Sequence, residues 1–187
     1  LGGRVGTVTV EAIGFYREVT DLIVDVDDGS GETTVTANRP DRVKVRGASL
    51  IASGGVTSAV SGSLGYTYTR SQRSNELAGG YASLAGIPAN QVQGTLDLHP
   101  AVVPFGATLT VNRVGEMFDS VSGFGSVPSG DYAIVDLSGR VFLDSRRRHR
   151  LNLRLENALD EQYASIHSRG FTDGAATPFV VNHLGTP

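Results

Sequence analysis

Apolar and polar residues alternate strictly along much of the chain, most clearly in the run RLNLRL near position 150. Leu151, Leu153 and Leu155 fall on one face of this segment, whereas Asn152 and Arg154 fall on the other. A period of two predicts a β-strand with one apolar face and one polar face. A leucine row facing water would promote association, so we interpret this row as facing lipid and the polar row as lining an aqueous lumen.

Seven segments share this alternation, and each is a predicted strand: 7–17, 42–53, 60–70, 91–99, 107–118, 132–143 and 150–155. The connections between them alternate in length, being short at 54–59, 100–106 and 144–149 and long at 25–41, 71–90 and 119–131. Short turns on one side and longer loops on the other are typical of outer-membrane barrels. The sequence therefore predicts an all-β fold, an antiparallel meander of about seven strands that is part of a large transmembrane β-barrel.

Several positions are expected to disturb the regular pattern. The apolar parity of the second strand switches at Gly47, which predicts a β-bulge there. Arg113 falls on the lipid-facing parity, where an arginine near the midplane would cost about 2–4 kcal/mol, so we expect a bulge or a position near the interface. We also expect residues 22–26 to extend the first strand. The chain is expected to begin in a Gly-Gly turn, and residues 164–187 are expected to form a final loop.

Composition narrows the classes of function. The 187 residues include 24 glycines and no cysteine, which favours strands and turns and excludes a disulfide framework or a thiolate metal site. The net charge of −3 does not indicate nucleic acid as a partner. No run approaches the ~18 apolar residues of a transmembrane helix. No signal peptide is visible before the first turn, so we expect a cleaved leader or a fragment.

Few residue clusters point to a specific chemistry. The acidic loop 25–32 invites a calcium site because it offers oxygen ligands, but it departs from the EF-hand pattern and a solvated turn is preferred. The four histidines lack ligand spacing, and no Gly-x-Ser-x-Gly motif marks a nucleophile. We therefore expect no metal site, no cofactor and no enzymatic activity, with calcium in the 25–32 loop left open.

Two groups of side chains are candidates for binding. Tyr163, His167, Arg169 and Phe171 lie in a predicted extracellular loop and suit an anionic or aromatic ligand, although an ordinary loop is the simpler interpretation. A second group could line a wall that attracts anionic cargo, and it comprises Arg42, Lys44, Arg46, Arg140, Arg154 and Glu156. For this group the preferred interpretation is a set of lumenal ion pairs that contact a plug filling the barrel.

Several short motifs occur in the order found in a known family. They are Glu-Asn-Ala-Leu-Asp-Glu-Gln-Tyr over 156–163, Tyr-Thr-Tyr over 66–68, Val-Gly-Glu over 114–116 and Asp-Tyr-Ala-Ile-Val-Asp-Leu over 131–137. Together these motifs resemble the barrel strands of TonB-dependent outer-membrane receptors, whose penultimate strand usually has Leu-Phe where this chain has Ala158 and Leu159.

This resemblance implies a place in the Gram-negative outer membrane and energy-coupled uptake of a bulky, scarce ligand, such as a metal–siderophore complex, cobalamin or an oligosaccharide. The implied partners are outer-membrane lipid, the receptor's own plug domain, the TonB system and a small-molecule ligand, without nucleic acid. Residues 1–187 would be the C-terminal portion of the barrel, with the plug domain and the closing strand absent. The alternative is a secreted or surface β-sandwich with a structural or adhesive role. A passive porin fits the motif order less well.

Overall fold

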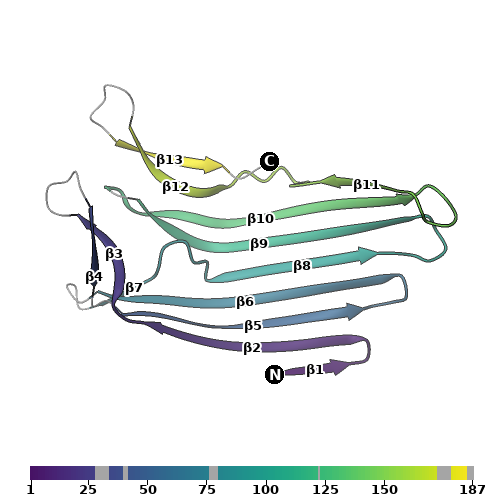
Figure 1. The fold of residues 1–187 in the computed structure, drawn as a ribbon, viewed down its shortest axis with the longest axis horizontal. Coiled ribbons are helices and arrows are strands. Elements are labelled where there is room, and N and C mark those ends of the chain that lie inside the picture. The colour runs from purple at the N-terminus through teal and green to yellow at the C-terminus, as the bar shows by residue number, and fades with distance from the viewer. Residues whose placement is uncertain (28–33, 40–41, 76–79, 122, 172–177, 185–187) are drawn as a thin grey trace.

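The computed structural model describes residues 1–27, 34–39, 42–75, 80–121, 123–171 and 178–184. Most of these residues lie in β-strands, and this part of the chain has no helix that could cross a membrane. The main sheet is antiparallel and has nine strands, eight of which follow one another across it (Figure 1). These eight are β1 (Gly2–Val5), β2 (Val8–Val19), β5 (Val43–Gly55), β6 (Val60–Asn75), β8 (Asn90–Leu98), β9 (Phe105–Val121), β10 (Gly125–Phe142) and β11 (Arg150–Leu155).

The predicted meander is confirmed, because each of the seven predicted strands pairs with the next one along the chain. The predicted initial turn is wrong, since Gly2–Val5 forms β1 and pairs with β2. The amide N–H of Ala12 donates to the carbonyl of Leu1, so hydrogen bonding continues beyond β1. The edge of β2 exposes backbone donors and acceptors, and a short extended segment satisfies them at little cost.

The long connections contain more strand than the sequence predicts. The expected loop over 25–41 includes a hairpin of β3 (Leu22–Asp27) and β4 (Thr34–Arg39), and residues 22–26 do not extend β2 within the main sheet. The final loop is instead a hairpin of β12 (Ala164–Phe171) and β13 (Pro178–Leu184). The loop over 119–131 is largely an extension of β9 and β10, and β7 (Gly80–Ala82) pairs with β6 inside the loop over 71–90. Paired strands supply the hydrogen bonds that lone extended segments lack.

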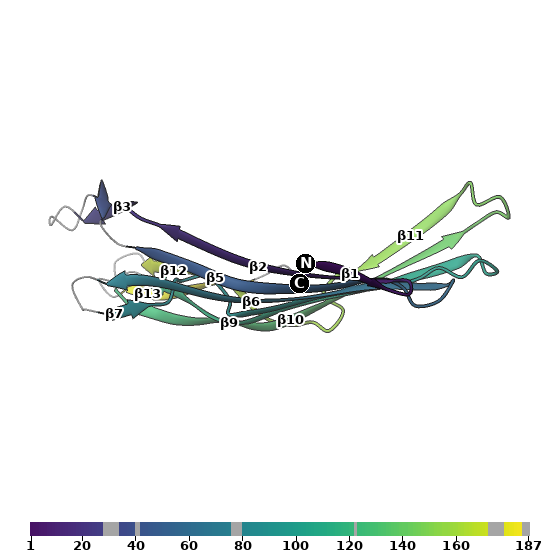
Figure 2. The same ribbon diagram turned by 90° about the horizontal axis from the view of Figure 1, so that it is seen from below.

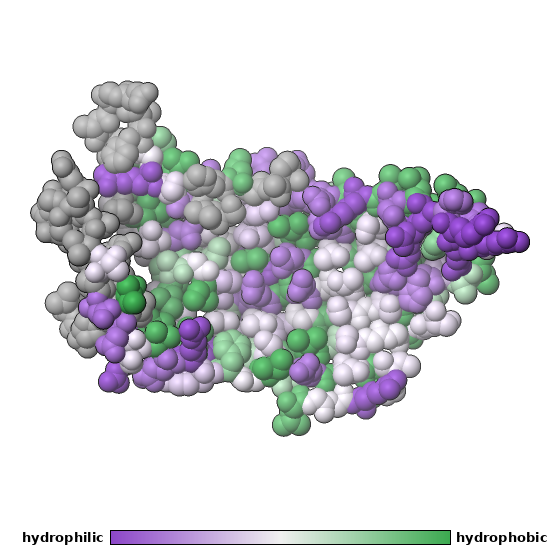
Figure 3. Space-filling view, in the orientation of Figure 1, coloured by the Kyte–Doolittle hydropathy of each residue, from purple (hydrophilic) through white to green (hydrophobic). Residues whose placement is uncertain are grey.

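The sheet is curved (Figure 2), and its two faces differ in chemistry. On the polar face the hydroxyls of Ser49 and Thr67 lie 2.9 Å apart across β5 and β6. On the opposite face the alternating leucines are exposed, including Leu50 at 51%, Leu64 at 57% and Leu153 at 66%. The concave face carries mostly pale and purple residues over the middle strands (Figure 3). The predicted alternation is therefore confirmed, with the leucine rows on the convex side.

Two predicted irregularities are resolved by the pairing. The bulge at Gly47 is wrong, because β5 keeps an unbroken register with both β2 and β6 at this residue. A Cβ at Gly47 would lie 2.6 Å from Cζ of Phe15 and would also meet the backbone oxygen of Tyr68. The glycine therefore makes room for the Phe15 ring, which comes from the neighbouring strand β2. Arg113 lies on the convex parity without a bulge, and its guanidinium donates to the Asp131 carboxylate at 2.7 Å.

A single curved layer leaves little interior. The buried apolar side chains among the described residues are Val43, Val114 and Val121, and none of the large side chains is fully buried. A β-sandwich would bury the leucine rows between two sheets, whereas here the rows stay exposed on the convex face. The sandwich alternative is therefore wrong for the described part of the chain.

Candidate functional site

The middle of the concave face is a wall of uncharged polar side chains. A hollow of about 530 Å³ lies there, and the residues that line it are Ile51, Ser63, Gly65, Thr67, Gln91, Gln93, Thr95 and Asn112. Hydroxyls and amides from β6, β8 and β9 reach this side because the strand period places every second residue there, and β5 contributes Ile51. Such a wall can donate and accept hydrogen bonds along an aqueous or protein-filled lumen.

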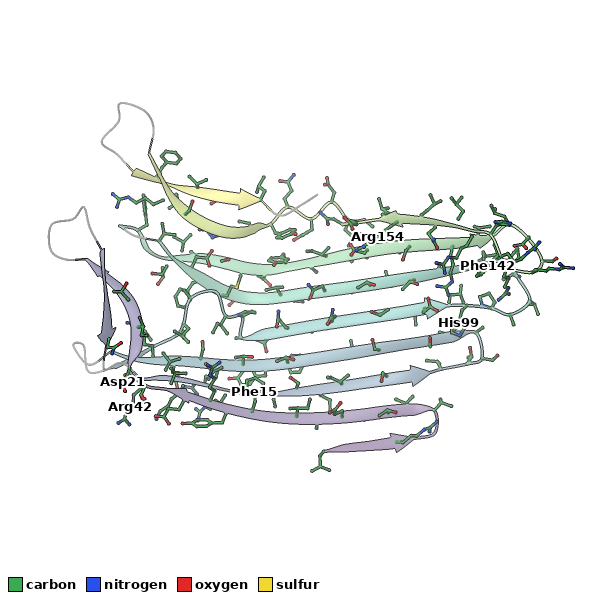
Figure 4. The ribbon with its side chains drawn as sticks, in the orientation of Figure 1. Phe15, Asp21, Arg42, His99, Phe142 and Arg154 are labelled. Atoms are coloured by element: carbon green, nitrogen blue, oxygen red, sulfur yellow. The ribbon has the colours of Figure 1, made fainter. Side chains whose placement is uncertain are left out.

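A charged cluster lies on the same face near the short turns. Nη1 and Nη2 of Arg140 donate to the two carboxylate oxygens of Asp97 at 2.9 and 3.0 Å, and the Thr108 hydroxyl donates to the same carboxylate at 2.6 Å. Nδ1 of His99 lies 2.9 Å from that carboxylate. His99 and Phe142 occupy this end of the sheet, opposite Asp21 and Arg42 (Figure 4). The two-pronged contact fixes the guanidinium in one orientation across three strands.

A second ion pair follows on β10 and β11. Arg154 donates to Asp136 at 3.3 Å, and its Nη2 lies 3.2 Å from a carboxylate oxygen of Glu156. For Arg140, Arg154 and Glu156 the predicted ion pairs are therefore confirmed. That they contact a plug stays a prediction.

Lys44 and Arg46 do not belong to this wall, which corrects the sequence prediction. With no bulge at Gly47, they share the convex face with Leu50. The expected parity switch at the glycine had placed them on the lumenal side. Glu18, on the same face, forms ion pairs with Lys44 at 3.9 Å and with Arg42 at 4.0 Å.

The segment after β11 is a tight turn anchored by one buried asparagine. Asn157 has a φ of 49°, a left-handed conformation that asparagine tolerates better than most residues. Its side-chain amide donates to the carbonyl of Glu161 and accepts from that residue's amide, both at 3.0 Å. The backbone amide of Asn157 donates to Asp136 at 2.9 Å. Residues from two of the family-like motifs therefore meet here, in a structural role that their types alone did not reveal.

Two members of the predicted ligand-binding set already contact other side chains, and the role of the set in ligand binding stays a prediction. The Tyr163 ring stacks on Tyr132, with centroids 4.3 Å apart and planes 24° apart. The His167 side chain is 8% exposed, and its Nδ1 lies 2.7 Å from Asp119 of β9. The Asp119 carboxylate also accepts from the backbone amide of His167 at 3.0 Å. These two predicted residues therefore hold the chain after β11 against β9 and β10.

The other two predicted residues lie further along β12. Arg169 is exposed, and its guanidinium group lies near Gly123. A Cβ added to that glycine would be 3.8 Å from the guanidinium carbon. The side chain of Phe171 falls outside the described part of the structure, as does most of the acidic loop over 25–32. Tyr132 and Asp119, which hold Tyr163 and His167, were not predicted, because nothing in their local sequence marks a partner so far along the chain. Within the described residues no three His, Asp or Glu side chains are placed to bind a metal.

Several solved structures share this fold. The ferric yersiniabactin uptake receptor FyuA of Yersinia pestis superposes with a TM-score of 0.73 at 17% identity, covering 98% of this chain and 26% of that one. The ferripyoverdine receptor of the outer membrane of Pseudomonas aeruginosa gives 0.69 at 14% identity, covering 96% and 24%. The ferric-catecholate import receptor Fiu of E. coli K12 gives 0.64 at 16% identity, covering 95% and 24%.

The chain thus spans about a quarter of the length of the solved structures that it matches. At these identities the likeness shows the fold alone. No curated protein matches the sequence at a significant level. The family model of the TonB dependent receptor-like β-barrel matches residues 2–158, and the chain therefore belongs to the TonB-dependent receptor β-barrel family.

Proposed function

We propose that this chain forms part of the barrel wall of an outer-membrane receptor that imports a bulky, scarce ligand with energy from the TonB system. The observation that carries the proposal is the two-faced sheet, with exposed leucines and tyrosines on the convex side and polar side chains on the concave side. A water-soluble protein would have to cover the convex rows, whereas lipid does so without further structure.

The edges of the sheet support the same conclusion. Within the described residues, β1 and β11 each pair on one side only, which leaves a row of backbone donors and acceptors on the other. Lipid cannot satisfy these groups, so a spanning sheet has to close into a barrel. We propose that residues 1–187 are the C-terminal portion of such a barrel, that further strands close it, and that a plug domain carries the contact with TonB.

The ligand class is carried over from the solved relatives. The relatives named above are a ferric yersiniabactin uptake receptor, a ferripyoverdine receptor bound to ferripyoverdine and a ferric-catecholate import receptor. We therefore propose a metal–siderophore complex as the first ligand class to test, ahead of cobalamin or an oligosaccharide. Tyr163, His167, Arg169 and Phe171 remain proposed ligand contacts. Arg169 is the one chosen for the test below because it is exposed, whereas the His167 side chain is buried.

Uptake in a living cell tests the proposal. The full reading frame that carries this sequence would be expressed in a Gram-negative host without its own siderophore receptors, with and without a functional tonB gene. Radiolabelled ferric siderophores, cobalamin and an oligosaccharide would be offered in turn. Uptake of one of them only when TonB is present supports the function. Uptake that continues without TonB would contradict it.

A matched pair of variants tests the ligand contact. Arg169→Gln is expected to raise the ligand concentration needed for half-maximal uptake several-fold, since a charge-assisted contact to an anionic ligand is lost. Arg146→Gln removes the same charge from an exposed turn residue at the other end of the sheet and should leave uptake unchanged. Equal behaviour of the two variants would remove Arg169 from the proposed site.

A further inference from the structure

An unneutralised pair of arginines lies on the convex face, next to the long hairpins. Arg46 of β5 is directly opposite Arg70 of β6 in the register, and both side chains are exposed. Like charges directly opposite each other on one face of a sheet repel and are destabilising. In the part of the chain that the structure describes, neither arginine forms an ion pair. The fold alone gives no reason for this arrangement.

The neighbouring cations are neutralised, which makes the contrast sharper. Two residues from Arg46 along β5, Nζ of Lys44 lies 3.9 Å from a carboxylate oxygen of Glu18 on β2, and the same oxygen lies 4.0 Å from Arg42. The Tyr16 hydroxyl donates to Glu18 at 2.7 Å. The acidic group on this patch of the convex face is therefore already engaged.

The two arginines lie just beyond the apolar part of the convex face. The nine residues from Val60 to Tyr68 precede Arg70 on β6, and their convex positions end in Tyr66 and Tyr68. A membrane-spanning strand needs about 9–11 residues, and aromatic girdles mark both interfaces. Arg70 is therefore the first convex position beyond the apolar band. Tyr16 of β2 is directly opposite Arg46 in the register, at the same level.

We propose that Arg46 and Arg70 bind the phosphate of a phosphorylated glycolipid in the outer leaflet of the membrane. A phosphate between two guanidinium groups relieves their repulsion and accepts two-pronged hydrogen bonds from each. The tyrosines below them suit the boundary between headgroup and acyl chain. The assignment rests on the proposed membrane function, since it needs the convex face to meet lipid and the long hairpins to be extracellular.

The full-length receptor, purified in detergent, provides the test. Retention of diphosphorylated lipid A would be measured by native mass spectrometry and compared with dephosphorylated lipid A, phosphatidylglycerol and inorganic phosphate. Each arginine near an anionic headgroup contributes about fivefold in binding, so Arg46→Gln/Arg70→Gln should weaken retention on the order of 10- to 30-fold. Arg146→Gln/Arg150→Gln removes two exposed cations at the short-turn end and should retain the lipid as wild type does.

Several results would overturn the assignment. One is equal retention by wild type and by Arg46→Gln/Arg70→Gln. Equal retention of dephosphorylated lipid A or of phosphatidylglycerol would assign the patch to acyl chains or to any anionic lipid. Displacement by millimolar inorganic phosphate would assign it to a free anion. If the double variant fails to fold, Arg46→Lys/Arg70→Lys should still show a partial, measurable loss, because lysine keeps the charge without the fork. TonB-dependent uptake, measured on the same variants, separates failure of this assignment from failure of the proposed function.

Discussion

The two faces of the sheet are built from the same strands, because alternate residues of each strand point to opposite faces. The faces therefore differ only in the side chains that they carry. On β6, Leu64 points to the convex side and is 57% exposed, whereas its neighbour Ser63 lines the hollow on the concave side. The leucine rows of the convex face are exposed, whereas the concave rows are held by hydrogen bonds and ion pairs that cross from strand to strand. Exposed apolar rows are stable only if their surroundings are apolar, so the contrast supports the proposal of lipid on one side and an aqueous lumen on the other.

The largest expected effect comes from placing a charge on the convex face. Leu64 lies at the centre of the nine-residue stretch from Val60 to Tyr68, so Leu64→Arg should destabilise the folded receptor by about 2–4 kcal/mol. Ser63→Arg, one residue away on the lumenal side, should cost less than about 1 kcal/mol because water and polar groups can reach it. Urea unfolding in lipid vesicles measures both. Equal costs would show that the two faces have the same surroundings.

The turn after β11 should show the next largest effect. Asn157→Ala removes both side-chain hydrogen bonds to Glu161 and places a less tolerant residue at a φ of 49°, for an expected loss of about 1–3 kcal/mol. Asn157→Gly keeps the backbone conformation but loses the same hydrogen bonds, so the difference between the variants isolates the conformational part. The midpoints of urea unfolding measure both losses, provided that the dependence of the unfolding free energy on urea concentration is the same in all variants. An unchanged midpoint for Asn157→Ala would contradict the anchoring role.

The lumenal ion pair should contribute less. Asp97 and Arg140 are each about a quarter exposed, at 27% and 25%, so solvent screens their attraction. A double-mutant cycle with Asp97→Asn and Arg140→Gln should give a coupling free energy of about 1 kcal/mol, since the contact is two-pronged. The same cycle on Arg113 and Asp131, which are more than half exposed, should give a smaller value. A larger coupling at Arg113 would reverse the expected ranking.

The smallest effect concerns the turn between β10 and β11. The backbone amide of His149 donates to Asp144 at 3.0 Å and lowers the pKa of that carboxyl below its usual value of 3.8, with Arg148 helping. A lowered folded-state pKa contributes stability that is complete above the unfolded value and is lost as the pH falls through the folded value. Acidification below about pH 4 should therefore lower the protection factor of the His149 amide, which is the ratio of its intrinsic to its observed exchange rate. Asp144→Asn should show the lowered protection factor across the whole range; a protection factor that still falls with acid in this variant would rule out Asp144 as the source.

Much of the fold could be predicted from the sequence because the period-two signal is local. The alternation within each segment is enough to predict a strand and its two faces. The seven strands and the leucine rows could therefore be predicted without knowing which strands pair. Features that depend on a neighbouring strand were missed. The parity switch at Gly47 looks like a bulge until Phe15 is seen to occupy the space that a side chain would fill. The pairing of β4 with β3 could not be predicted either, because it depends on a partner strand that the local pattern does not identify.

The candidate site shows the same limit. Residue types correctly marked Arg140, Arg154 and Glu156 as members of ion pairs, which lie on the concave face. They could not show that His167 is held by Asp119, which lies 48 positions earlier in the chain. Types suited to a ligand are also suited to anchoring a hairpin, and only the geometry distinguishes the two roles.

A spin-label scan along β11 tests most directly that the convex face meets lipid and the concave face meets water. The 187 residues contain no cysteine, so a nitroxide can be attached at each position from 151 to 155 in turn, in the full receptor in vesicles. We expect Leu151, Leu153 and Leu155 to be relaxed by oxygen dissolved in the bilayer, and Asn152 and Arg154 by a water-soluble nickel chelate. An alternation of opposite phase, or nickel access at all five positions, would contradict the account.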